Sequence, residues 1–401
     1  MKFLLFICAF FLWFPCCIFA QEGPVEDQTR LFEQWKKEFR KQALQEGISK
    51  KTLNTYLPQM TLLPTVVKSD RKQAEFILTF WQYMDRALNP NRIQRGKEMF
   101  HANYDMLQEI YQTYSVPPHY ILAFWGMETN YGTTKGNVSI LNALATLAFD
   151  ERRREFFSKQ LISYLRLLEQ GHIKPAKGSW AGAMGHFQFI PTTFEGYAID
   201  ADGDGKKDIV DNLYDSALSA GNYLFSMGWH KGSRWGREVL ITRLLPWERV
   251  YDGQPKTVHD WFQMGLVPAN GDVWTEDDLK MTAHLLMPMG INGPIFLTYP
   301  NFQIIKRWNN SDLYALAIGL LADRIVDQQT QIYAHRTDER LKVEEVEELQ
   351  QKLTEKGYYK GKIDGKIGKK LQHAIRKVQK EFGMQQDGYP TKDFILKLDT
   401  Y

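Results

Sequence analysis

Residues 117–132 constrain the fold most, because they place one carboxylate on the apolar side of a short helix. Two prolines open this stretch and a glycine closes it, as is typical of a helix start and stop. Ile121, Phe124 and Trp125 recur at helical spacing, and Glu128 projects from the same stripe. We expect Glu128 to be partly desolvated and to act as a general acid. A surface glutamate at a frayed helix end is the alternative.

A second stretch, residues 178–191, has the composition of a ligand-binding turn. It combines Gly and Ala residues, which let a ligand approach the backbone, with Gln188 as a polar group. A glycine-rich turn alone is more often an ordinary loop, so this stretch indicates a binding site only in combination with the first one.

The two stretches together resemble lytic murein transglycosylases of the membrane-bound B type, which are glycoside hydrolase family 103-like. The motifs are Trp-Gly-Met-Glu-Thr-Asn-Tyr-Gly at 125–132 and Gly-Ser-Trp-Ala-Gly-Ala-Met-Gly-His-Phe-Gln-Phe at 178–189, and the resemblance runs from about Leu31 to Asp327. It implies a mainly α fold with a lysozyme-like catalytic domain and additional helices. It makes Glu128 the catalytic residue, and it implies these substrate-binding residues: Ser179, Gln188, Tyr223, Trp308, Asn309 and Tyr314. Trp308 departs from the family, in which a Tyr is common at that position.

Composition fits this interpretation and excludes one class of partner. The 401 residues include 50 Lys and Arg against 47 Asp and Glu, so the chain lacks the basic field of nucleic-acid-binding proteins. Its 11 Trp and 19 Tyr include rings that can stack on sugars, although most are expected in the core.

The first twenty residues have the pattern of a secretory signal. Lys2 precedes an apolar run that ends at Ala20, the expected cleavage site, although an uncleaved membrane anchor is the alternative. All three cysteines, Cys8, Cys16 and Cys17, lie inside this segment. A cleaved chain therefore has no disulfide, thiolate metal site or Cys nucleophile. We expect an exported protein of the bacterial periplasm.

Residues 200–211 have the spacing of a calcium-binding loop. Acidic side chains occupy loop positions one, three, five, nine and twelve, a glycine occupies position six, and a backbone carbonyl is expected at position seven. The predicted ligands of a structural Ca²⁺ are Asp200, Asp202, Asp204, Lys206 through its carbonyl, Asp208 and Asp211. An acidic turn without metal is the alternative, and no organic cofactor is expected.

The sequence divides into four parts. Residues 1–20 are the signal, 21–329 the catalytic domain, 330–342 a polar linker and 343–401 a tail with helical periodicity. The tail is similar to the small three-helix peptidoglycan-binding domain of wall enzymes, and a module that only stabilises the fold is the alternative. It departs from that family at residues 369–371, where a Thr is common.

The resemblance implies cleavage of the MurNAc-β-1,4-GlcNAc bond of peptidoglycan without water, forming 1,6-anhydromuramic acid ends. Glu128 then serves first as acid and later as base. A hydrolytic lysozyme-type muramidase with a second carboxylate is one alternative, and a non-catalytic wall-binding protein is another. Glycan strands are the expected partner of a monomer, and other cell-wall enzymes are candidate partners.

Overall fold

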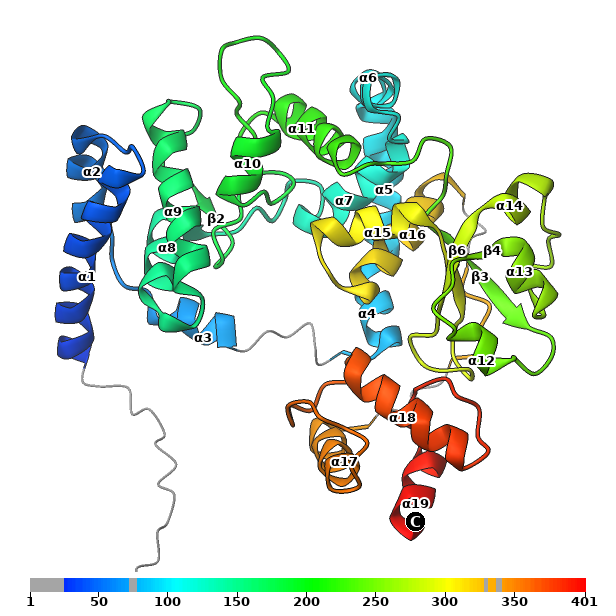
Figure 1. The fold of residues 1–401 in the computed structure, drawn as a ribbon. Coiled ribbons are helices and arrows are strands. Elements are labelled where there is room, and N and C mark those ends of the chain that lie inside the picture. The colour runs from blue at the N-terminus through cyan, green and yellow to red at the C-terminus, as the bar shows by residue number, and fades with distance from the viewer. Residues whose placement is uncertain (1–24, 72–77, 328–330, 337–340) are drawn as a thin grey trace, which may run out of the picture.

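The structure is a computed structural model that describes residues 25–71, 78–327, 331–336 and 341–401 (Figure 1). The predicted signal, residues 1–20, lies outside the described residues. The chain is mainly helical, which confirms the fold class expected from the resemblance. Among the described helices, none combines the length and the apolar character that a membrane crossing requires.

One end of the molecule is built from the N-terminal helices and a helical hairpin (Figure 1). Phe32, Trp35 and Phe39 of the first helix are buried, and the first two rings pack against Phe149. Leu31 of the same helix is 41% exposed. The elements here are α1 (Val25–Gln45), α2 (Lys50–Tyr56), η1 (Leu57–Gln59), α3 (Pro64–Arg71), β1 (Val138–Ser139), α8 (Ile140–Phe149), η3 (Glu151–Arg153), α9 (Arg154–Glu169) and β2 (Lys177–Gly178), with β1 paired to β2.

The centre of the predicted catalytic domain is α7 (Pro118–Thr129), which is apolar almost all round and is therefore enclosed by other helices. It packs against α16, α5, α6 and α11. The helices around it are α4 (Phe80–Ala87), α5 (Pro90–Ala102), α6 (Tyr104–Tyr114), α10 (Pro191–Tyr197), α11 (Leu213–Ser226), α15 (Pro300–Trp308) and α16 (Asp312–Val326).

The sequence analysis did not anticipate a β-subdomain, residues 236–298, which interrupts the helical core. Its sheet has the order β4-β6-β7-β3-β5, with antiparallel neighbours, and it has a separate core around Val239, Trp261 and Leu297. Its elements are β3 (Gly236–Ile241), α12 (Trp247–Val250), β4 (Lys256–Thr257), α13 (Val258–Gln263), β5 (Leu266–Pro268), α14 (Glu276–Lys280), β6 (Thr282–Leu286) and β7 (Phe296–Thr298).

The tail forms a three-helix unit with its own apolar core, as the sequence predicted. The helices are α17 (Val343–Glu355), α18 (Lys369–Glu381) and α19 (Lys392–Thr400). Gln350, which is fully buried, organises the turn after α17, because its Oε1 accepts hydrogen bonds from the N–H groups of Asp364 and Gly365 at 2.8 and 3.0 Å. The turn is thus fixed by one amide side chain.

Part of the predicted linker is held against the catalytic domain. We call residues 331–336 the strap; positions 330 and 337–340 of the predicted linker lie outside the described residues. The carboxylate of Glu238 accepts hydrogen bonds from the N–H groups of Tyr333 and Ala334 at 2.7 and 2.9 Å. Arg336 donates to both oxygens of Asp85, at 3.0 and 2.7 Å. These contacts fix the direction in which the chain leaves the catalytic domain.

The tail also contacts the β-subdomain directly. The indole N–H of Trp247 donates to Oε1 of Gln385 at 2.9 Å, and the N–H of Ile291 donates to Asp387 at the same distance. The guanidinium of Arg376 lies 4.4 Å from the ring centre of Tyr251, a cation–π contact. The tail is therefore docked on the β-subdomain.

Reversing the charge of Arg376 should release the tail. Arg376→Glu replaces a cation over the Tyr251 ring with an anion and removes a contact of about 1–2 kcal/mol. We expect small-angle X-ray scattering to show a larger radius of gyration, while circular dichroism keeps the helical content. Lys377→Glu, an exposed neighbour on α18, should leave the scattering unchanged. Equal scattering from both variants would contradict a docked tail.

Candidate active site

Glu128 lies in the last turn of α7, half-buried, beside the first turn of α16. The hydroxyl of Tyr314 donates a hydrogen bond to its Oε1. Tyr314 is 4% exposed, and its backbone is fixed because Ser311, the N-cap residue of α16, accepts from the Tyr314 N–H at 3.3 Å. The structure therefore joins the predicted catalytic residue to a predicted substrate-binding residue 186 positions away.

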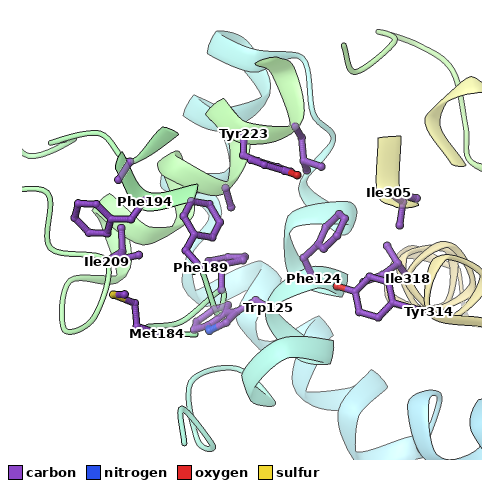
Figure 2. Packing of buried hydrophobic residues seen from close by; sticks show 14 of the residues in the cluster. Phe124, Trp125, Met184, Phe189, Phe194, Ile209, Tyr223, Ile305, Tyr314 and Ile318 are labelled. Carbon is purple, nitrogen blue, oxygen red and sulfur yellow. The ribbon is translucent and has the colours of Figure 1, made fainter. Parts of the chain in front are cut away.

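Trp308 is the centre of an aromatic cluster next to Glu128. Its half-buried ring lies 4.5 Å from Phe124, 5.0 Å from Tyr223 and 5.3 Å from Phe189 between ring centres. Figure 2 shows Phe124 and Tyr314 facing each other, with Phe189 and Tyr223 on the other side of Phe124. The hydroxyl of Tyr223 donates to the carbonyl of Arg307 at 2.9 Å. The cluster therefore brings the predicted residues Tyr223, Trp308 and Tyr314 together.

The chain directly after Glu128 turns through three left-handed residues. Asn130, Tyr131 and Gly132 have φ angles of 48°, 59° and 82°, conformations that cost free energy for residues other than glycine. The hydroxyl of Tyr131 donates to the carbonyl of Arg92 at 2.9 Å. A Cβ on Gly96 would lie only 2.5 Å from the hydroxyl oxygen of Tyr131. Only glycine leaves room for the Tyr131 ring there, and the buried ring fixes the C-terminal end of α7.

His186 attaches the glycine-rich turn to α7. Thr129 Oγ1 donates to the carbonyl of His186 at 2.7 Å, and the indole N–H of Trp125 donates to its Nδ1 at 3.2 Å. Burial, followed by the charge of Lys135, lowers the pKa of His186 to about 4. Its imidazole is therefore neutral at physiological pH. Sequence reasoning missed this role, although Trp125, Thr129 and His186 all lie inside the two motifs.

Ser179 and Gln188 shape the glycine-rich turn itself. The hydroxyl oxygen of Ser179 accepts from the N–H groups of Ala181 and Ala183, at 3.3 and 3.0 Å, so its hydrogen can be donated to a ligand. Gln188 has a φ of 51°, and its Nε2 donates to the carbonyls of Lys135 and Gly185 at 3.1 and 3.0 Å. Its carbonyl oxygen is the group that can accept from a ligand.

Asn309 ends α15, directly after Trp308. Its half-buried side chain forms no hydrogen bond with the described residues, so the amide can bind a ligand. The ion pair between Lys306 and Asp312, at 2.6 Å, spans the turn that carries it. The turn is thus held from both of its ends.

The acidic loop brings three of its predicted ligands together. Carboxylate oxygens of Asp200, Asp202 and Asp204 lie within 4.8 Å of one another. Asp208 and Asp211 are not in this group; Oδ1 of Asp208 accepts from two backbone N–H groups, and Asp211 is exposed. Lys206, expected to act through its carbonyl, is exposed in the same loop.

Asp215 organises the acidic loop, and the sequence analysis missed it. This fully buried carboxylate accepts from the N–H groups of Ala201 and Asp208, both at 2.8 Å, and so joins the two ends of the loop. Burial raises the pKa of Asp215, and the backbone hydrogen bonds oppose that change. An aspartate four residues after the loop is the only sequence signal of this role.

Comparison with known families gives two matches. The model described as "Transglycosylase SLT domain" matches residues 31–323, and the model described as "Putative peptidoglycan binding domain" matches residues 342–398. Together they cover the catalytic domain, the β-subdomain and the tail.

Individual relatives agree with these two family matches. The chain is 40% identical to SltB3 from Pseudomonas aeruginosa, solved in complex with NAG-NAM-pentapeptide, with a TM-score of 0.86 over 92% of this chain and 99% of that one. It is 32% identical over 250 residues to membrane-bound lytic murein transglycosylase B from Escherichia coli (strain K12), a match to 61% of this chain and 66% of that protein's length. Escherichia coli Slt35, solved with calcium, is 27% identical, with a TM-score of 0.62 over 79% of this chain and 98% of that one.

The SLT-domain match spans most of the chain and includes Glu128, the aromatic cluster and the acidic loop. The second match coincides with the docked three-helix tail. The chain therefore belongs to the lytic transglycosylase family, with an SLT catalytic domain followed by a peptidoglycan-binding domain.

Proposed function

We propose that this protein is a peptidoglycan lytic transglycosylase that cleaves the MurNAc-β-1,4-GlcNAc bond without water and leaves 1,6-anhydromuramic acid ends. The observation that carries the proposal is the half-buried carboxyl group of Glu128, which accepts a hydrogen bond from Tyr314 beside an aromatic cluster. This arrangement supplies one positioned acid and apolar ring surface for sugars.

In the proposed mechanism the two oxygens of Glu128 have different tasks. Tyr314 donates to Oε1, so the transferable proton of the neutral acid resides on Oε2. Oε2 gives this proton to the leaving oxygen while the acetamido oxygen of the substrate attacks the anomeric carbon. Tyr314 stabilises the resulting carboxylate. The carboxylate then accepts the proton of the muramyl 6-hydroxyl as that oxygen displaces the acetamido group, and Glu128 is again an acid.

The other acidic residues that lie close to the two motifs in the sequence support a mechanism with one carboxylate. Hydrolytic glycosidases generally need a second carboxyl group close to the bond that is cleaved. Glu195 is paired with Arg166 at 2.8 Å, Asp150 is paired with Arg71 at 3.2 Å, and Glu151 is exposed on η3. These three candidates are therefore occupied elsewhere or solvated, which favours ring closure by the substrate over attack by water.

Four residues of the site are proposed to hold the sugars. The Trp308 ring offers a stacking plane, and Ser179, Gln188 and Asn309 offer a hydroxyl hydrogen, an amide oxygen and an amide group. SltB3, the relative solved with NAG-NAM-pentapeptide and with NAG-anhNAM-pentapeptide, supports a substrate that carries peptides. We expect Tyr223 and Tyr314 to act by positioning Trp308 and Glu128.

The acidic loop is proposed to hold a structural Ca²⁺. Three carboxylates whose oxygens lie within 4.8 Å repel one another unless a cation lies between them, and hard oxygen ligands suit calcium. Asp200, Asp202 and Asp204 would hold the ion, with the Lys206 carbonyl, Asp208 and Asp211 completing the set. The relative Slt35, solved with calcium, supports this assignment. The ion would neutralise the loop and leave proton transfer to Glu128.

The proposed setting is the bacterial periplasm, with residues 1–20 as an export signal. A membrane-bound relative acting on murein and a tail matching a peptidoglycan-binding family support work at the cell wall. We expect a monomer whose partner is the glycan strand, with other cell-wall enzymes as further candidate partners.

Glu128→Gln should reduce glycan cleavage by about 10²–10⁴-fold, because the amide keeps the shape but has no transferable proton. Glu151→Gln, which removes an exposed carboxylate, should retain activity. Mass spectrometry of sacculus digests measures both variants. The parent should give muropeptides one water lighter than those with reducing ends. Mainly reducing ends would favour the hydrolytic alternative, and an active Glu128→Gln would overturn the assignment.

Tyr314→Phe should lower kcat about tenfold with a smaller change in KM, because the ionised carboxylate loses its hydrogen-bond donor. Tyr120→Phe is the matched control, since that buried hydroxyl on α7 accepts from the Trp235 N–H instead. It should change stability but not kcat; a parental kcat for Tyr314→Phe would contradict the role of Tyr314.

Calcium should raise the melting temperature of the parent, with a stabilisation of about 2.7 kcal/mol at a free concentration one hundred times Kd. Asp202→Asn with Asp204→Asn should abolish this response, because two of the three clustered carboxylates lose their charge. Asp272→Asn with Asp277→Asn removes the same charge from exposed positions and should respond like the parent. If neither calcium nor a chelator changes the melting temperature of the parent, the loop is an acidic turn without metal.

A further inference from the structure

A cavity lies where the β-subdomain, the strap and the tail meet. Its volume is about 600 Å³, which is within the range of small-ligand sites. The β-subdomain supplies β3 with the loop after it and residues 291–295, the strap supplies Ala334 and His335, and the tail supplies Gln385. Interfaces between domains are a preferred place for ligand sites.

One wall of this cavity is a strand edge without a partner strand. The N–H of Thr242, directly after β3, and the carbonyl of Glu238 in β3 bond to the residues on either side of β5. Alternate residues of β3 therefore direct their backbone groups to the opposite edge. On that edge β7 pairs only with residues 236–238, and the last ladder bond runs from the Val239 N–H to the carbonyl of Ile295. Among the described residues no strand continues the pairing at Ile241, so its N–H and C=O face the cavity.

The exposed side chains around this edge are mainly apolar, with one cationic group, the guanidinium of Arg243, at the margin and the carboxylate of Glu238 bonded to the strap. Leu240 and Leu244 are 46% and 80% exposed, a large exposure for leucine. Arg243, which donates one hydrogen bond to the carbonyl of Gln263, and His335 also line the cavity. Small apolar side chains and carboxylates on one ligand would match this lining.

We propose that this cavity is a second substrate site, which binds the stem peptide of peptidoglycan in an extended conformation. The peptide backbone adds to β3 at Ile241, its alanine methyl groups contact Leu240 and Leu244, and its carboxylates lie near Arg243 and His335. The inference rests on the proposed function, because that function makes peptide-bearing glycan the substrate.

The site is complete only when the tail is docked. Glu238 holds the strap through the N–H of Ala334, which places Ala334 and His335 on the wall of the cavity. Gln385, which accepts from the Trp247 indole, closes the cavity from the tail. Peptide binding and tail docking should therefore depend on each other.

The test is isothermal titration of the full chain with a free stem pentapeptide that carries no sugar. Leu244→Glu places an anion at the cavity on an exposed position, so folding should be unaffected. It should weaken peptide binding at least fivefold, whereas Val273→Glu, at an 82% exposed apolar position of the same subdomain that does not line the cavity, should bind like the parent. Equal affinities for the two variants, or no binding to the parent, would overturn the proposal.

A second measurement separates this site from the active site. Leu244→Glu should cleave peptide-free glycan at the parental rate, since Glu128 and its partners are untouched. Arg376→Glu, which releases the tail, should lose peptide affinity; parental affinity in that variant would overturn the three-part site. Activity that survives in Glu128→Gln would refute the proposed function, while the peptide titration still decides whether the cavity binds peptide.

Discussion

The enclosure of the apolar helix α7 is the constraint on which the arrangement of the site depends, and the hydrogen bond between Tyr314 and Glu128 makes that enclosure compatible with a carboxyl group at the end of the helix. A helix as apolar as α7 must be enclosed, and enclosure penalises any charge at its end unless a polar group supports it. Tyr314 is that group, and it comes from α16, a helix that packs along α7. The aromatic cluster around Trp308 lies at the same junction, so the packing that stabilises the core also positions the site.

The helices were predictable because their apolar residues recur at helical spacing and their ends carry standard signals. α7 has Pro at its start, and the helical periodicity expected of the tail corresponds to α17 and α18. The β-subdomain was not predictable in this way. Its strands are two to six residues long, and β3 pairs with β7 and β5 over different halves. Short strands show too little alternation to separate them from loops.

The candidate site was predictable only where the pattern that reveals a residue lies in its own stretch of sequence. Glu128 projects from an apolar stripe, and its position could be inferred locally. Its partner Tyr314 was named from the resemblance, because no periodicity relates residues 186 positions apart. His186 and Asp215 carry no pattern of their own; each acts through backbone groups of a turn, which exist as a unit only in the folded chain. Spacing alone describes the acidic loop but not the buried carboxylate that closes it.

The strap changes what the tail can contribute. A free linker would let the tail search a volume around the catalytic domain, and its benefit would be a higher local concentration. Here Asp85 and Glu238 fix the path of the chain, and the tail is docked on the β-subdomain. The distance from the tail to Glu128 is therefore set by the fold and not by the conformations of a linker. A peptidoglycan strand held by the tail would then meet the site from one fixed direction and separation.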